Sequence, residues 1–299
     1  KFDRVGKAKI QLIKCATTPT VYGGSDGSGI TNETEIYLKG MTTNTIYGGS
    51  DTDGIVTTSK IYLQTGTTTD VYGGGYGGTT TTSNVTFEGS STVESIFGGS
   101  NTNGTVGTSN IQLKSGNLTN VYGGGNSAIV GSTNVTLDGI TIDAIYGAAK
   151  NAGATTNTNV VLKSGKVKDA FGGGYNIGAT NAKVTQKGAI VTNIFGGTNG
   201  LIESAGTTTN SNITVENAQA NNVYGGNKNN GITKNAKINI SGTSKILGEL
   251  YGGGYNTDIG TASTTGTTII NISGGIISND VNGGSKGRTV HGKVNINIG

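Results

Sequence analysis

Short segments of alternating apolar and polar residues recur along the chain. In residues 84–89, Val85 and Phe87 alternate with polar residues before the segment ends at a glycine, and residues 134–139 and 237–242 repeat the pattern. A period of two is typical of a β-strand with one buried face, so Val85 and Phe87 should point inward. The sequence therefore predicts one such strand in every repeat of the pattern.

A second motif separates these strands and consists of an aliphatic residue, an aromatic residue and two glycines. Successive aromatic residues of this tetrad lie 24 to 29 residues apart. Ala148 replaces the second glycine of one copy, and an eleventh copy has Asn282 in place of the aromatic residue. The ten aromatic residues are Tyr22, Tyr47, Tyr72, Phe97, Tyr122, Tyr146, Phe171, Phe195, Tyr224 and Tyr251.

Self-similarity at this period indicates a solenoid, because a propeller blade needs about 40 residues or more. We predict an all-β fold: a single right-handed parallel β-helix of eleven or twelve coils, with a period near 25 residues, over residues 1–299. The right hand is a preference that the sequence alone does not prove. Each coil should contain the alternating strand, a strand that carries the tetrad, and a weaker third element such as residues 54–56 or 231–233.

The composition supports a β-rich repeat and excludes several other classes. Glycine contributes 55 residues without a three-residue period, and only 13% of residues are charged, which argues against collagen and classical disorder. The net charge is +4, but the lysines are dispersed and the only arginines are Arg4 and Arg288, so we expect no nucleic-acid partner. We expect no membrane insertion either, since no long apolar run is present. The single cysteine, Cys15, is expected to be a buried free thiol.

The tetrads, interleaved with strands such as Ser-Asn-Val-Thr-Phe-Glu-Gly at residues 83–89, resemble the repeat regions of surface and adhesin-like proteins of anaerobic bacteria and some archaea. The architecture also resembles the β-helical domain of tāpirins, which are cellulose-binding surface proteins. The resemblance covers about residues 8 to 299. It implies a secreted or cell-surface-attached module that binds a polysaccharide or a cell-surface glycan, without catalysis and without a cofactor. Because the sequence begins in mid-pattern, we expect it to be part of a longer surface protein.

An enzymatic alternative is open, because right-handed β-helices also include polysaccharide lyases and glycoside hydrolases. Hydrolases need two suitably spaced carboxylates, and the best stacked pair is Glu249 with Asp280. A nucleophilic triad would need the only histidine, His291, which lies close to one end of the solenoid. Asp51 and Asp53 form a weak calcium candidate, since the sequence has only the opening of a calcium loop and otherwise reads as an Asp-Gly turn.

Two orientations are open for the tetrad aromatic residues. Simple alternation after an inward aliphatic residue sends the rings outward, where they would form a flat ligand-binding strip. A bulge at the glycines would instead place the rings inside as a stacked core. The same alternation predicts that Tyr37 and Tyr62 face solvent, and the remaining tyrosines, at positions 76, 175 and 255, look scattered.

A third alternative is an ice-binding or self-assembling fibre protein. Threonines 79–82 and 207–209 are numerous but are expected mainly in loops, and the outward strand position varies between coils, which does not suit a regular threonine ladder. The segments 8–14 and 293–299 are strands of one type at opposite ends, and neither end shows a cap. Open strand edges can pair with another chain, so two alternatives are open: further domains cover these ends, or the modules self-associate end to end.

Overall fold

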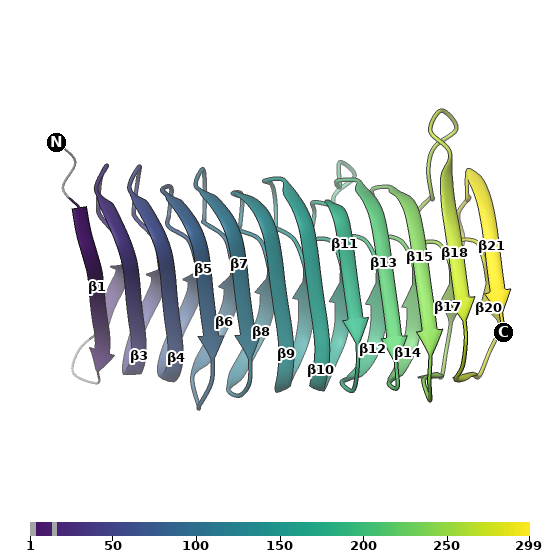
Figure 1. Ribbon diagram of the computed structural model, residues 1–299, viewed down its shortest axis with the longest axis horizontal. Coiled ribbons are helices and arrows are strands. Elements are labelled where there is room, and N and C mark those ends of the chain that lie inside the picture. The colour runs from purple at the N-terminus through teal and green to yellow at the C-terminus, as the bar shows by residue number, and fades with distance from the viewer. Residues whose placement is uncertain (1–3, 14–16) are drawn as a thin grey trace.

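The computed structural model describes residues 4–13 and 17–299, so Cys15 lies outside the described residues. The described chain is a parallel β-solenoid of about 12 turns with a period of about 25 residues (Figure 1). The strands facing the viewer in Figure 1 run downward and those behind run upward while the chain advances from left to right. The coil is therefore right-handed, as predicted.

The front sheet of Figure 1 is built from the alternating segments, one per coil. Four long strands bend at a corner and enter both sheets: β3 (Ile30–Tyr47), β4 (Ile55–Tyr72), β9 (Ile129–Tyr146) and β10 (Thr155–Phe171). The other front strands are β1 (Arg4–Ile13), β5 (Thr79–Phe87), β7 (Thr105–Leu113), β11 (Ala179–Gln186), β13 (Thr208–Glu216), β15 (Thr233–Ser241), β18 (Gly266–Ile272) and β21 (Gly292–Ile298).

The rear sheet contains the strands that end at the tetrad. Its separate strands are β2 (Thr17–Tyr22), β6 (Thr92–Phe97), β8 (Asn117–Tyr122), β12 (Ile190–Phe195) and β14 (Gln219–Tyr224). In the last two coils this strand is interrupted and leaves the short pairs β16 (Lys245–Ile246) with β17 (Leu250–Tyr251), and β19 (Ile276–Ile277) with β20 (Val281–Asn282). Equivalent residues of successive coils pair in parallel, as in Ile36↔Ile61 and Tyr47↔Tyr72.

The predicted third strand is wrong. Ile55 and Val56 begin the long front strand β4, and Thr233 begins β15, so neither segment is a separate side of the coil. The third side is the loop after the two glycines, whose backbone bonds to the same loop in neighbouring coils, for example Asp51 N to Ser25 O at 2.9 Å. The sequence pattern missed it because a loop rich in glycine and polar residues can stack through its backbone alone.

The aliphatic core is a set of columns inside the coil. Ile36, Ile61 and Val85 form one column, and Leu38, Leu63 and Phe87 form another. These six side chains are at most 1% exposed. The aliphatic residue of each tetrad joins the same core from the rear sheet. Val85 and Phe87 therefore face inward, as the alternation predicts.

Buried hydroxyl groups form a further internal column beside the aliphatic core. Ser59 Oγ donates to the Gly73 carbonyl at 2.6 Å, and Ser109 Oγ donates to the Gly123 carbonyl at 2.5 Å. The same bond, from the front strand to the first tetrad glycine of its own coil, occurs from Thr34, Ser83, Thr133, Thr158, Ser211 and Thr268. These bonds fix the distance between the front strand and the tetrad corner within one coil.

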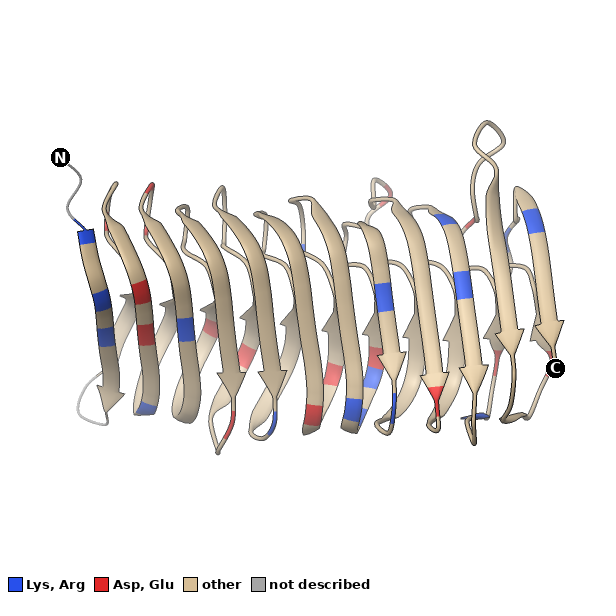
Figure 2. Cartoon of the chain, in the orientation of Figure 1, with Lys and Arg blue, Asp and Glu red and all other residues tan. Residues whose placement is uncertain are grey.

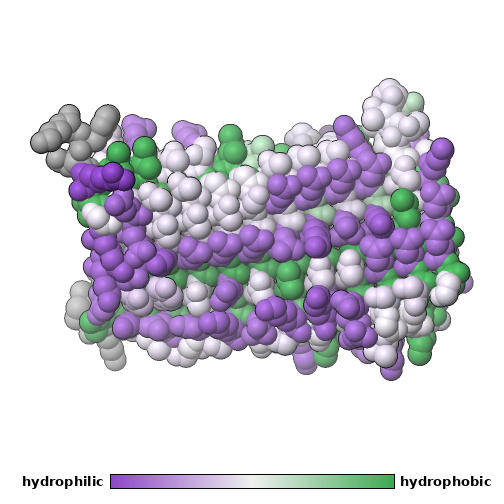
Figure 3. All heavy atoms as spheres, viewed as in Figure 1, coloured by the Kyte–Doolittle hydropathy of each residue, from purple (hydrophilic) through white to green (hydrophobic). Residues whose placement is uncertain are grey.

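Asparagine side chains form hydrogen-bonded ladders on the outer face of the front sheet. Asn110 donates to Asn84, Asn134 to Asn110, and Asn159 to Asn134 through their carboxamides, at 3.0 to 3.3 Å. Such stacked carboxamides are typical of in-register parallel strands. Figure 3 shows hydrophilic bands that run along this face from end to end.

Charged residues are scattered over the molecule, and most of the front sheet is uncharged (Figure 2). Threonines 79–82 lie in β5 and threonines 208 and 209 in β13, so the expectation that these residues occupy loops is wrong. Within residues 4–13 and 17–299 there is no helix long and apolar enough to cross a membrane.

Candidate binding groove

The ten tetrad aromatic residues, called here the aromatic column, form a continuous stack along one side of the solenoid. From Tyr22 to Tyr224 neighbouring ring centroids lie 4.6 to 5.0 Å apart with interplanar angles of 6 to 15°. The last step, to Tyr251, is 5.8 Å. The spacing follows from the separation of parallel strands, about 4.8 Å.

The aromatic column lies outside the aliphatic core but is not exposed. It packs as a separate cluster, while the preceding aliphatic residue of each tetrad belongs to the central core. The rings from Tyr47 to Tyr224 belong to residues that are at most 5% exposed, and only Tyr22 and Tyr251 at the two ends are half-buried. Alternation therefore gives the direction of the rings correctly, but the flat exposed strip does not form because other side chains cover it.

The covering side chains come from a second column, called here the cover column, that lies four residues after the second position of each tetrad. Its backbone is stacked as well, since Tyr76 N bonds to Ser50 O and Lys150 N to Gly125 O, both at 3.0 Å. The cover column consists of Asp26, Asp51, Tyr76, Asn101, Asn126, Lys150, Tyr175, Asn199, Lys228, Tyr255 and Lys286. The tyrosines that look scattered in the sequence thus share one place in the fold.

Members of the cover column lean back over the rings of the preceding coils. Tyr76 stands edge-on against Tyr47 with centroids 5.9 Å apart, and Tyr175 and Tyr255 make the same contact at 5.5 and 5.4 Å with rings of the aromatic column. The Lys228 ammonium lies 5.4 Å from the Phe195 ring centroid. Lys150 lies similarly near two rings, at 5.7 and 5.9 Å. The cover is therefore formed by upright tyrosines and cation–π lysines.

A chain of polar side chains borders the opposite side of the column, two residues before the aromatic position. Asn193 Nδ2 donates to Asp169 Oδ1 at 2.6 Å, Asn222 Nδ2 donates to Asn193 Oδ1 at 2.8 Å, and the Glu249 backbone N–H donates to Asn222 Oδ1 at 2.8 Å. Each residue belongs to a successive coil. The rear sheet thus holds a rigid polar edge along the aromatic column.

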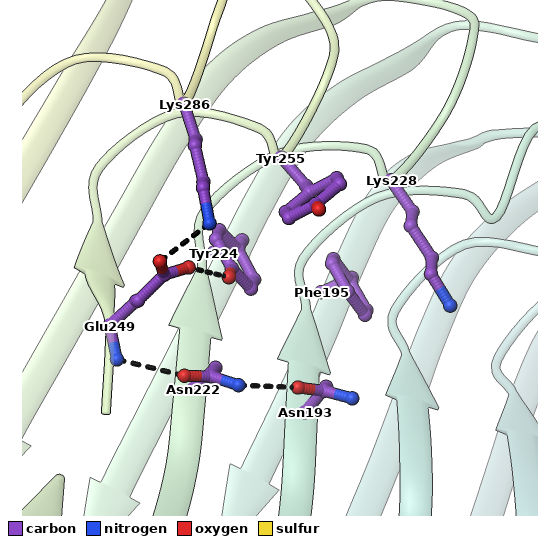
Figure 4. A pocket seen from close by; sticks show the side chains of 8 residues that line it. All are labelled: Asn193, Phe195, Asn222, Tyr224, Lys228, Glu249, Tyr255 and Lys286. Carbon is purple, nitrogen blue, oxygen red and sulfur yellow. Dashed lines mark hydrogen bonds and ion pairs between the residues drawn. The ribbon is translucent and has the colours of Figure 1, made fainter. Parts of the chain in front are cut away.

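Between this polar edge and the cover column lies an open hollow of about 480 Å³. Figure 4 shows its eight lining side chains: Asn193, Phe195, Asn222, Tyr224, Lys228, Glu249, Tyr255 and Lys286. Glu249 lies at one end of the hollow, where Lys286 Nζ contacts Oε1 at 2.5 Å and the Tyr224 hydroxyl donates to Oε2. Lys228 Nζ lies 2.9 Å from Asp169 Oδ2 at the other end.

Three titrating groups of this hollow, Tyr224, Glu249 and Lys286, have pKa values shifted away from neutrality. Hydrogen bonds from Lys286 and Tyr224 lower the pKa of Glu249, and the bond to Glu249 raises the pKa of Lys286. Burial, followed by the contact with Glu249, raises the pKa of Tyr224. At neutral pH these groups are a carboxylate, an ammonium and a neutral phenol. A general acid or base works best with a pKa near the operating pH, so this cluster is better suited to binding than to proton transfer.

The other residues singled out from the sequence lie outside the hollow. Asp280 is exposed beside Glu249 in the next coil and is not among the residues that line the hollow. His291 Nε2 lies 3.9 Å from Asp258 Oδ2. Asp51 and Asp53 lie in the loop of one coil, and no group of three or more His, Cys, Asp or Glu suited to a metal occurs in the described ranges. Tyr37 and Tyr62 are half-buried on the front sheet and stack at 4.7 Å.

Sequence reasoning found the aromatic column but missed the groove. Lys150, Lys228 and Lys286 are the cationic members of the cover column, and their constant offset of four residues from the second tetrad position is visible in the sequence.

The chain matches no protein-family model, no curated protein and no solved structure. The likeness to β-helical repeat proteins therefore concerns architecture.

Proposed function

We propose that this chain is a non-catalytic module, secreted or attached to a cell surface, that binds polysaccharide along the groove beside the aromatic column. The observation that carries the proposal is the hollow itself. It places two aromatic rings of the column, an upright tyrosine and a hydrogen-bonded polar edge around one open space.

The chemistry of this lining matches a sugar ring, which has apolar C–H faces and polar hydroxyl edges. Aromatic side chains offer large rigid apolar surfaces, and a few fixed polar groups give orientation. Tyr76 and Tyr255 are 41% and 39% exposed, so their rings offer contact surface above the column. Because equivalent positions repeat from coil to coil, a long polymer lying parallel to the solenoid axis could contact several coils at once.

The experiment is co-sedimentation with insoluble cellulose, pectin and chitin, beside a reducing-sugar assay on the soluble polymers. We expect retention on at least one polymer and no product release. Release of reducing ends would overturn the non-catalytic assignment in favour of a lyase or hydrolase.

Two variants locate the binding face. Tyr76→Ala with Tyr255→Ala should weaken retention several-fold, since two exposed rings are lost. Tyr62→Ala on the front sheet is the matched control and should leave retention unchanged. Equal loss in both variants, or loss only in the control, would place binding elsewhere on the molecule.

A further inference from the structure

We infer that the hollow lined by Lys228, Glu249 and Lys286 selects acidic saccharides, whose carboxylates bind to the ammonium groups at its two ends. The inference rests on the proposed function, and it narrows the ligand class of that same site. The observations behind it are the hydrogen-bond partners of the carboxylates, lysines and asparagines around the hollow.

The two carboxylates at the hollow have their oxygens engaged. Asp169 accepts from Asn193 at Oδ1 and from Lys228 at Oδ2, at 2.6 and 2.9 Å. Glu249 accepts from Lys286 at Oε1 and from the Tyr224 hydroxyl at Oε2. Each of the four carboxylate oxygens therefore already has one donor, and each carboxylate charge is paired with a lysine.

The donors, in contrast, are in excess. An ammonium has three N–H donors, and each lysine uses one of them on its carboxylate partner. Asn193 and Asn222 each use one of two amide N–H groups within the polar edge. The hollow therefore presents spare donors on two cations and two carboxamides.

A ligand that complements this arrangement brings acceptors and negative charge. A carboxylate fits best, because charge-assisted hydrogen bonds are about twice as strong as neutral ones. Lys228 and Lys286 side chains are 29% and 37% exposed, so their free N–H groups can reach a ligand from the hollow. Phe195, Tyr224 and Tyr255 supply the apolar surface for the ring that carries the carboxylate.

The test compares tetragalacturonate with its fully methyl-esterified form by isothermal titration calorimetry on the whole chain. The two ligands share shape and ring faces and differ in charge. We expect the acid to bind about tenfold tighter or more, which is the effect of one hydrogen bond to a charged group. The preference should shrink as salt is raised, because both lysines are partly exposed.

Lys228→Met with Lys286→Met should abolish the preference for the acid, while Lys228→Arg with Lys286→Arg should retain it. Lys187→Met is the control. Lys187 does not line the hollow, and its Nζ lies 3.8 Å from Glu216 Oε2. Thermal unfolding checks each variant, and the single change Lys286→Gln replaces the double Met variant if that one unfolds.

The outcomes separate the two proposals. Equal or tighter binding of the ester, or a preference that survives loss of both lysine charges, would overturn the acidic selectivity while leaving glycan binding in place. Binding of neither tetrasaccharide, together with no retention on any insoluble polymer, would overturn the proposed function itself.

Discussion

At the residue scale, the buried hydroxyl of Ser109 shows how one side-chain oxygen can contribute to the free energy of unfolding. It donates to the Gly123 carbonyl at 2.5 Å, and within the described residues that carbonyl accepts no other hydrogen bond. At the equivalent position Ala182 has no hydroxyl, so the Gly196 carbonyl lacks this donor. The column of buried hydroxyl groups therefore includes coils that have this hydrogen bond and a coil that lacks it.

Ser109→Ala should lower the free energy of unfolding by about 1–3 kcal/mol, because it leaves a buried carbonyl without a partner. Ala182→Ser should raise it by about 1 kcal/mol by adding the missing bond. Urea unfolding of the two variants and of Ser109→Thr, which keeps the hydroxyl, measures both effects. A Ser109→Ala variant as stable as the parent would show that the hydroxyl column does not stabilise the coil.

The phenols of the aromatic column predict a loss of stability at alkaline pH. Burial, followed by the neighbouring Asp51 carboxylate, raises the pKa of Tyr22 from 10.0 to about 12. Burial likewise raises the pKa of Tyr72, Tyr122 and Tyr146. Because the phenol pKa is higher in the folded state than in the unfolded state, these groups add their full contribution to the free energy of unfolding below about pH 10. That contribution is lost as the pH rises from about 10 through the pKa of the folded state.

We therefore expect cooperative unfolding to accompany tyrosine ionisation above about pH 10. Ultraviolet difference titration follows the phenolates, and circular dichroism follows the strands. Ordinary, independent titration of all tyrosines with the fold intact would contradict this expectation.

At the scale of elements, the front strand could be predicted from the sequence and the loop could not. Val85 and Phe87 alternate with polar residues, and a strand with one buried face generally shows this alternation in its sequence. The loop after the tetrad shows no comparable pattern, because its backbone forms hydrogen bonds to the same loop in adjacent coils whichever side chains it carries. The direction of Tyr47 followed from alternation, but its burial did not, since the covering Tyr76 and Asn101 belong to later coils.

The stack of aromatic rings behaves as a core element, although it lies outside the central core. Phe97 is 2% exposed between Tyr72 and Tyr122, so Phe97→Ala should cost about 3–5 kcal/mol of unfolding free energy. Tyr76→Ala removes an exposed cover ring and should change stability by about 0.5 kcal/mol or less. Chemical unfolding compares the two, and similar small effects would show that the column is not a stabilising core.

At the scale of the whole molecule, the terminal coil at β21 leaves an apolar sheet face uncovered. Val294, Ile296 and Ile298 are 45%, 41% and 72% exposed. Their alternation matches Ala8, Ile10 and Leu12 of β1, so β1 of a second copy could continue each internal column. Such contacts are head-to-tail and do not close into a ring by themselves.

For an isolated chain of residues 1–299 we expect a molar mass that rises with concentration, measured by size-exclusion chromatography with light scattering. Ile296→Lys with Ile298→Lys should keep the chain monomeric, because charge on an exposed strand opposes pairing. A parent chain that is monomeric at every concentration would exclude this mode of association.

The hydroxyl bonds described above join residues of one coil, whereas the backbone ladder joins equivalent residues of adjacent coils. Excision of residues 98–122 would bring Gly123 to the place of Gly98, and the Ser83 hydroxyl would find the same kind of carbonyl. Gain or loss of one whole repeat during evolution therefore moves the hollow by about one strand spacing along the solenoid axis and leaves the local pairing of coils unchanged. The copy number of the repeat then determines how far the hollow lies from the first coil.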